Sequence, residues 1–98
     1  MKWPILAHPS VDDDLVEAAR YYAAIDPDLA EDLLTRVEDA KRRIAATPKM
    51  HRIIWRDVRR TLVGRFDYGV FYRVLADHVQ VLAVYHMKRD PAGWQQRV

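Results

Sequence analysis

The side chains best suited to chemistry stand at the end of the last apolar run of the chain. His86 closes that run, and Lys88 and Arg89 lie within three residues of it. An imidazole beside two cations can act as a general acid or base, and the cations can bind a phosphate or a carboxylate. The alternative is a histidine that hydrogen-bonds to the backbone at a strand end.

Three further arginines, Arg59, Arg60 and Arg65, share one predicted strand. If Arg59 and Arg65 converge with Arg73 of a neighbouring strand and with Lys88 and Arg89, these five cations form an anion site for phosphates or acidic side chains. Otherwise Arg59, Arg60 and Arg65 are solvent-facing residues that pair with acids such as Asp57 and Asp67.

Arg73 stands inside a strongly apolar strand, where an unpaired charge is costly. We therefore expect it to line a cavity or to pair with a partner such as Asp77 or Asp90. Nearby aromatic residues could stack on nucleobases, although such residues more often belong to a core or an interface. They are Trp55, Tyr68, Tyr72, Tyr85 and Trp94.

Several classes of chemistry have no suitable residues. The chain has no cysteine, and its three glycines leave no room for a glycine-rich phosphate loop. The four histidines are scattered, and no pair of carboxylates has a spacing that matches a metal motif. Ser10 is the only serine and is placed to begin a helix. We therefore expect no metal, no cofactor and no hydrolytic triad.

The net charge of +2 is unevenly distributed. Residues 1–47 carry six Lys/Arg against ten Asp/Glu, a net of −4, whereas residues 48–98 carry ten against four, a net of +6. A basic half suggests an anionic partner, although an uneven but solvated surface would give the same count. With no apolar stretch near the ~20 residues of a membrane span, and no signal peptide, we expect a cytoplasmic protein that does not enter a membrane.

The periodicity predicts two helices between strands. Ser10 begins the first helix with a capping box, and an apolar stripe continues to Ile25. Asp26 and Pro27 begin the second, which must end near Thr47 because Pro48 follows. Strands are predicted at 3–8, 58–66, 70–76 and 79–87, with 53–55 either a strand or an ordered loop. The tail after Asp90-Pro91 should make one turn, with Trp94 folding back.

This order predicts an α+β fold in a single domain over residues 1–98. An N-terminal edge strand and an antiparallel helical hairpin should pack on one face of a mostly antiparallel, twisted sheet. The other face of the sheet should be concave and partly polar. The cations that follow His86, Lys88 and Arg89, would then lie at one rim of this sheet.

The chain resembles the RelE/ParE superfamily of bacterial toxins from type II toxin–antitoxin modules. The resemblance rests on the tyrosine-rich segment 68–74, the hairpin through Asp77 and the ending His86-Met87-Lys88-Arg89-Asp90-Pro91 with Trp94. The segment 18–22, Pro27, Pro48 and Arg59-Arg60 fit as well. It implies a RelE/ParE-like fold and a small growth-inhibiting, plasmid-stabilising toxin that a cognate antitoxin silences by wrapping a segment over it. A hetero-oligomer with that antitoxin, which alone would contact operator DNA, is also implied.

The superfamily divides by mechanism. RelE-like members cut mRNA on the ribosome with basic residues and a Tyr or His, whereas ParE-like members inhibit DNA gyrase. Gly69 and Trp94 stand where the cutting members often have Arg and Tyr, and His86 and Tyr85 could compensate only in part. The His-x-x-Arg-Asp-Pro ending is typical of ParE-like sequences, so the resemblance favours a toxin that poisons gyrase without being an enzyme.

Two alternatives remain open. A ribosome-dependent endoribonuclease would use Arg89, His86 and Arg73 as catalytic residues. A toxin-like protein without activity would bind only its antitoxin or operator DNA. For a non-enzymatic toxin the expected binding surface comprises Arg59, Arg60, Arg65, Lys88, Tyr72 and Trp94.

Overall fold

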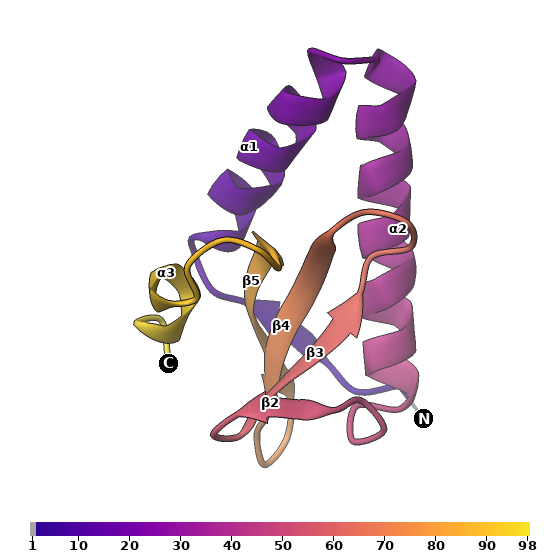
Figure 1. The fold of residues 1–98 in the computed structure, drawn as a ribbon. Helices are drawn as coiled ribbons and strands as arrows, with labels where there is room; N and C mark the ends of the chain where they lie inside the picture. The colour runs from indigo at the N-terminus through magenta and orange to yellow at the C-terminus, as the bar shows by residue number, and fades with distance from the viewer. Residues whose placement is uncertain (1) are drawn as a thin grey trace.

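A computed structural model describes residues 2–98 and shows the predicted α+β architecture (Figure 1). The elements, in chain order, are β1 (Ile5–Ala7), α1 (Val11–Ala23), α2 (Pro27–Ala46), β2 (Ile53–Trp55), β3 (Val58–Leu62), β4 (Tyr68–Val74), β5 (Val79–His86) and α3 (Ala92–Gln95). The short segment 53–55, left open from the sequence, is a strand. None of the helices in residues 2–98 is long and apolar enough to cross a membrane.

The five strands form one sheet in the order β1-β5-β4-β3-β2. β1 runs parallel to β5, and all other neighbours are antiparallel. β1 and β2 are therefore the two edges, which confirms the predicted N-terminal edge strand. Prolines at positions 4 and 9 flank β1 and do not interrupt its pairing.

The two helices begin in different ways. Asp26 is extended and its carboxylate accepts the Asp28 N–H at 3.0 Å, with Pro27 in the first turn, as predicted. The predicted capping box at Ser10 is wrong: the backbone of Ser10 is helical, its side chain caps nothing, and its N–H donates to His8 Nδ1 at 3.1 Å. The apolar stripe of this helix also ends before the predicted Ile25, because α1 ends at Ala23 and Ile25 is 63% exposed.

The third strand is shorter than predicted. β3 ends at Leu62, because the following turn contains Gly64 at φ +50°, a left-handed conformation that favours glycine. Phe66 consequently lies beyond the turn and packs into the helix-side core. The predicted end of this strand at residue 66 is therefore wrong.

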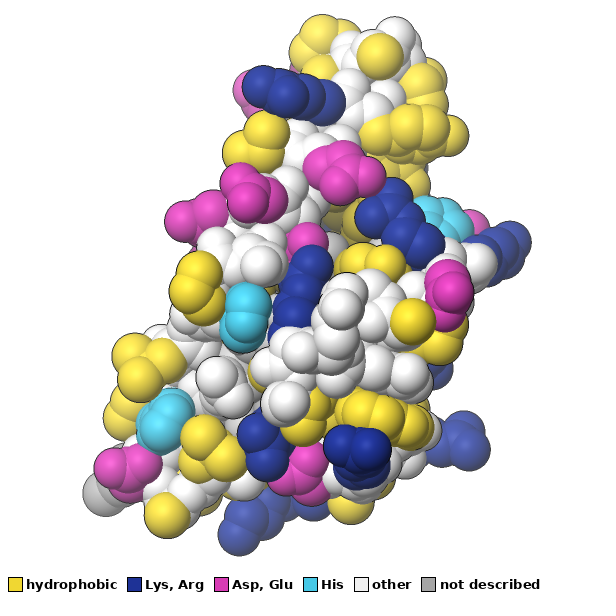
Figure 2. Space-filling view, turned by 90° about the vertical axis from the view of Figure 1, so that its left-hand side faces the viewer, with side chains coloured by type: hydrophobic (Ala, Val, Ile, Leu, Met, Phe, Trp, Pro, Cys, Tyr) yellow, Lys and Arg dark blue, Asp and Glu magenta, His cyan; other side chains and the backbone are white. Residues whose placement is uncertain are grey.

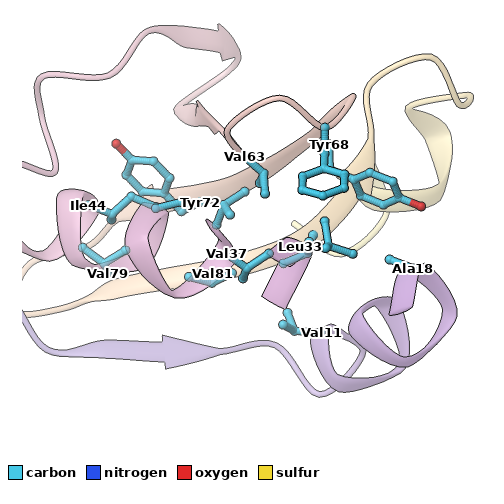
Figure 3. Packing of buried hydrophobic residues seen from close by; sticks show 14 residues of the cluster. Val11, Ala18, Leu33, Val37, Ile44, Val63, Tyr68, Tyr72, Val79 and Val81 are labelled. Carbon is cyan, nitrogen blue, oxygen red and sulfur yellow. The ribbon is translucent and has the colours of Figure 1, made fainter. Parts of the chain in front are cut away.

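The main core fills the space between the helical hairpin and one face of the sheet. Leu33, Val37 and Ile44 on α2 are fully buried against Tyr72 and Val81 (Figure 3). At helical spacing these α2 residues form one continuous apolar face. β4 presents alternate residues to it, whereas β5 presents Val79, Val81 and Val84 because the register of the two strands shifts. The hairpin is thereby fixed on the sheet.

The opposite face of the sheet carries a second, smaller apolar cluster. Trp94 folds back from α3 as predicted, is 3% exposed and stacks on Phe71 at a ring distance of 4.7 Å. Leu82 and Ala83 are buried beneath it. The prediction of a partly polar face is thus wrong at its centre, which α3 covers.

A partly buried ion pair fixes the C-terminal residues to the rest of the fold. Arg97 donates to both carboxylate oxygens of Asp14, at 2.6 and 3.0 Å, and to the carbonyl of Leu82 at 3.0 Å. Asp14 also accepts the backbone N–H of Val84. β1 pairs with β5 only as far as Val81. The side chains of Arg97 and Asp14 therefore provide hydrogen bonds to the Leu82 carbonyl and the Val84 N–H, which lie beyond the end of β1.

Tyr72 should make the protein sensitive to alkali. Burial raises the pKa of its phenol to about 12 from an ordinary value of 10.0, and its hydroxyl donates to Pro48 O at 2.6 Å. As the pH rises above 10, the unfolded chain loses this proton while the folded chain keeps it, so stability present at neutral pH is lost. Urea titrations should show a loss of about 2 kcal/mol from this residue as the pH approaches 12. Tyr72→Phe should lose less over the same range; an equal loss would contradict this assignment.

Candidate functional site

A cleft opens between the second half of α1 and the adjoining ends of β4 and β5. Its volume is about 480 Å³. The lining residues are Glu17, Tyr21, Tyr22, Ile25, Asp67, Tyr68, His86 and Arg89. We call it the hairpin cleft. It brings together two of the predicted site residues, His86 and Arg89, and adds two carboxylates and three tyrosines.

Arg89 is held in the hairpin cleft by its neighbours. Its guanidinium donates to Glu17 at 2.9 Å and lies 5.1 Å from the centre of the Tyr85 ring. Burial is the largest single influence and works against the charge of Arg89, but the hydrogen bonds and charge interactions with Glu17 and Tyr85 together outweigh it and raise the pKa of Arg89. The cation is therefore engaged with a carboxylate before any ligand arrives.

His86 packs against Tyr68 in an edge-to-face arrangement with ring centroids 5.2 Å apart. Its Nδ1 accepts the backbone N–H of Lys88 at 3.1 Å. In the neutral imidazole this bond assigns the single proton to Nε2. The remaining nitrogen then carries a hydrogen and cannot accept a proton, which does not suit a general base.

The charges at the cleft largely offset one another. Glu17 pairs with Arg89, and the ammonium of Lys88 lies 3.8 Å from a carboxylate oxygen of Asp67. Both acids line the hairpin cleft. A phosphate entering it would meet two carboxylates as well as the cations, which weakens its attraction.

The other predicted basic residues lie apart from this cleft. Arg59 donates to the carbonyls of Lys49 and His51, and Arg65 pairs with Asp32 at 3.1 Å. The five cations considered from the sequence therefore do not converge on one anion site. Arg60 lines a second pocket, of about 270 Å³, on the opposite face of the sheet, where it is joined by Arg89 and Trp94.

Arg73 pairs with a carboxylate, as one of the two predictions for it required. Its partner is Asp57, at 3.1 Å, and not Asp77 or Asp90. Asp57 lies in the turn between β2 and β3, and Arg73 lies on β4. Only the strand register brings the two together across the sheet.

The predicted aromatic contacts are mostly internal. Tyr72 is fully buried and Trp94 is 3% exposed, so neither ring is free to stack on a base. Tyr21, in contrast, is 63% exposed at the mouth of the hairpin cleft. Glu17 and Tyr21 were not recognised from the sequence, although their spacing of four residues places them on one face of α1. Within residues 2–98, no cluster of three or more His, Cys, Asp or Glu is arranged to hold a metal ion.

Comparisons with known proteins agree with this architecture. Residues 5–91 match the family described as "ParE toxin of type II toxin-antitoxin system, parDE". The chain is 34% identical to Toxin ParE2 of Mycobacterium tuberculosis, strains CDC 1551 / Oshkosh and ATCC 25618 / H37Rv, over 85 residues that cover 86% of this chain and 81% of the relative. A solved structure titled "Chromosomal ParDE TA system from P. aeruginosa" shares its fold with a TM-score of 0.78 at 13% identity, covering 89% of this chain and 98% of that one.

The α+β fold with a helical hairpin on a five-stranded sheet is thus that of a type II toxin. The chain belongs to the ParE toxin family.

Proposed function

We propose that this toxin inhibits bacterial growth by binding and poisoning DNA gyrase, without cleaving RNA. Membership of the ParE family and the His-x-x-Arg-Asp-Pro ending support this target. The exposed tip of the helical hairpin, with Tyr21 and Ile25 each 63% exposed, offers a surface for a protein partner. Such an activity belongs to the cytoplasm, where gyrase acts.

We also propose that a cognate antitoxin silences the chain by binding it in a hetero-oligomer. The name of the fold neighbour refers to a toxin–antitoxin pair, which supports this kind of partner. Binding of a partner only to the folded toxin would raise its stability by mass action. Contact with operator DNA would then come through the antitoxin.

The observation that carries the proposal is the state of Arg89. A nuclease needs a cation that is free to stabilise charge developing on a phosphate. Here Glu17 forms an exposed ion pair with the guanidinium, and Asp67 adds a second carboxylate to the same cleft. His86 has its Nδ1 committed to the Lys88 N–H, which leaves it unsuited to activate a ribose hydroxyl as a base.

A ribosome-dependent nuclease remains the second candidate. The observation in its favour is that Arg89 and His86, from the predicted catalytic set, line one cleft. Arg73, the third residue of that set, pairs with Asp57 and is not among the residues that line the cleft.

His86→Ala should leave growth inhibition within about twofold of that of the original chain. The reason is that His86 would be a packing residue and not a proton-transfer group, whose loss typically costs ~100-fold or more. Colony counts after induction, at matched protein levels, would measure this. Loss of inhibition in a variant with an unchanged melting temperature would favour the nuclease.

Purified components test the target directly. We expect the toxin to block DNA supercoiling by gyrase in the presence of ATP and to leave mRNA intact on translating ribosomes. Adding excess gyrase to the same reaction should relieve the inhibition of supercoiling. Site-specific mRNA cleavage with undisturbed supercoiling would reverse the assignment.

A further inference from the structure

The pocket on the sheet face opposite the helical hairpin differs in charge from the hairpin cleft. Most of the residues that line its volume of about 270 Å³ are apolar: Ile54, Trp55, Phe71, Met87, Pro91 and Trp94. The others are Arg60, Arg89 and Gln95, so two guanidinium groups and no carboxylate of the described residues line it. The hairpin cleft, in contrast, contains Glu17 and Asp67. We call this second space the Arg60 pocket.

Arg60 has a space made for it on this face of the sheet. Its side chain stands opposite Phe71 in the register of β3 and β4, and its stem lies over Gly69. A methyl group at Gly69 would come within 2.8 and 2.9 Å of Arg60 Cγ and Cδ, which is too close for both to stay in place. Among the described residues 2–98, no carboxylate lies within salt-bridge distance of the Arg60 guanidinium. The absent side chain of Gly69 thus lets an unpaired cation lie across the strands.

The charge of the Arg60 pocket suits a ligand with one negative charge. Arg89 already forms an ion pair with Glu17 at 2.9 Å, so these two charges offset one another. Arg60 then adds one positive charge that the lining does not balance. A monoanion neutralises that charge, whereas a phosphate monoester, with a charge near −2, brings an excess.

The distribution of charge over the molecule favours an anion at the same end. Figure 2 shows acidic side chains over the upper part of one face, and Lys and Arg side chains toward its lower end. Residues 40–60 carry eight Lys/Arg against one Asp, whereas residues 11–39 carry two against ten Asp/Glu. β2, which supplies Ile54 and Trp55 to the pocket, lies at the lower end (Figure 1). An anion is therefore attracted toward these walls.

The aromatic walls of the Arg60 pocket are fixed by contacts with one another. Phe71 and Trp94 stack at 4.7 Å, are each 3% exposed and close the floor. Trp55, which is partly exposed, meets Trp94 edge-on at 5.5 Å. The guanidinium of Arg56, a residue with φ +52° between β2 and β3, lies 4.3 Å from the centre of the Trp55 ring. A wall that is ordered before binding loses less conformational entropy when a ligand arrives.

We propose that the Arg60 pocket binds a small aromatic carboxylate, with the carboxylate on Arg60 and the ring against Trp55 and the apolar floor. A guanidinium donates two parallel hydrogen bonds to a carboxylate, and a flat ring packs against an indole. The volume lies just below the range of roughly 300–1,000 Å³ that sites for drug-sized ligands span, which suits a molecule with a single ring. This site is separate from the proposed action on gyrase.

A nucleic acid strand fits this site less well than a small carboxylate does. Arg89 lines both the Arg60 pocket and the hairpin cleft, so the two spaces are neighbours. A strand with one phosphate at Arg60 that continued past Arg89 would bring its next phosphates toward Glu17 and Asp67. Repulsion from these two carboxylates would oppose binding of the strand. A single monoanion meets no such carboxylate within the Arg60 pocket.

The first test titrates the full, isotope-labelled chain with benzoate and follows the indole N–H signals by NMR. The signals of Trp55 and Trp94 should shift, whereas that of Trp3, which lines a different pocket, should not. Benzamide has nearly the same shape without the charge and should bind at least about tenfold more weakly. Equal binding of benzamide, tighter binding of uridine monophosphate, an equal shift of Trp3 or no shift at all would overturn the proposal.

The matched variants are Arg60→Gln and Gly69→Ala, with Arg42→Gln as a control. Arg42 is an arginine of α2 whose side chain is 65% exposed. Arg60→Gln should bind benzoate at least about tenfold more weakly, and the control should change binding by less than about twofold. Gly69→Ala keeps every charge but displaces the Arg60 stem, so it should weaken binding at least about fivefold.

Melting temperatures would establish which variants are folded, and Gly69→Ala keeps the test decisive if Arg60→Gln is not. Unchanged binding by a folded Arg60→Gln variant, or by a folded Gly69→Ala variant, would overturn the proposal. Equal weakening in Arg42→Gln would assign the binding to net charge and overturn it as well. None of these measurements involves gyrase, RNA or an antitoxin, so their outcome is independent of the target of the toxin.

Discussion

Arg97→Ala is expected to lower the free energy of unfolding by about 3 kcal/mol. The side chains of Arg97 and Asp14 are only 15% and 10% exposed, so removing the cation leaves a largely buried carboxylate without its partner. The Leu82 carbonyl would also lose its donor at the open part of the β5 edge. Urea unfolding followed by circular dichroism measures the effect. For a protein of this size such a loss is a large part of the total stability.

An exposed ion pair provides the control for this prediction. Arg65 pairs with Asp32, and its side chain is 66% exposed. Because water screens such a pair, Arg65→Ala should cost less than about 1 kcal/mol. If the two variants destabilise the protein equally, the Asp14–Arg97 pair does not anchor the C-terminal residues in the way its burial indicates.

Trp94→Ala is expected to destabilise the protein by about 3–5 kcal/mol. The indole is 3% exposed and packs against Phe71 at 4.7 Å and Trp55 at 5.5 Å, so its loss leaves a cavity under α3. The apolar cluster on this face of the sheet would then be open to water. Thermal and urea unfolding would give the change in stability.

Trp94→Phe separates packing from binding. A smaller ring keeps part of the contact with Phe71, so this variant should lose less than half as much stability as the alanine variant. Growth inhibition by Trp94→Phe should remain close to that of the original chain at a permissive temperature. A stable Trp94→Ala variant that fails to inhibit growth would instead assign Trp94 to the binding surface expected from the sequence.

The order and type of the elements could be predicted because each segment has one dominant period. The α2 residues Leu33, Val37 and Ile44 repeat at helical spacing, and Asp26-Pro27 marks the start of that helix. The errors lie where local and tertiary preferences compete. Gly64 ended β3 early, and Ser10 adopted a helical conformation although its sequence context favours a cap.

The partners of the charged residues could not be predicted, because they depend on strand register and on contacts distant in the sequence. Arg97 and Asp14 are 83 positions apart, and Arg89 and Glu17 are 72 apart. The sequence predicted that His86 and Arg89 lie near one another, but it could not show that Glu17 forms an ion pair with Arg89. That carboxylate changes the interpretation of the cleft from a phosphate site to a surface with balanced charge.

The most direct test of the proposed target is pulse labelling in a bacterium during the first minutes after the toxin is induced. Incorporation of labelled thymidine and labelled methionine would be followed in parallel, with an uninduced culture as the control. We expect DNA synthesis to stop first, with a DNA-damage response, while protein synthesis continues. An early collapse of protein synthesis, with new 5′ ends in mRNA and DNA synthesis still under way, would contradict the account and identify Arg89 and His86 as residues of a nuclease.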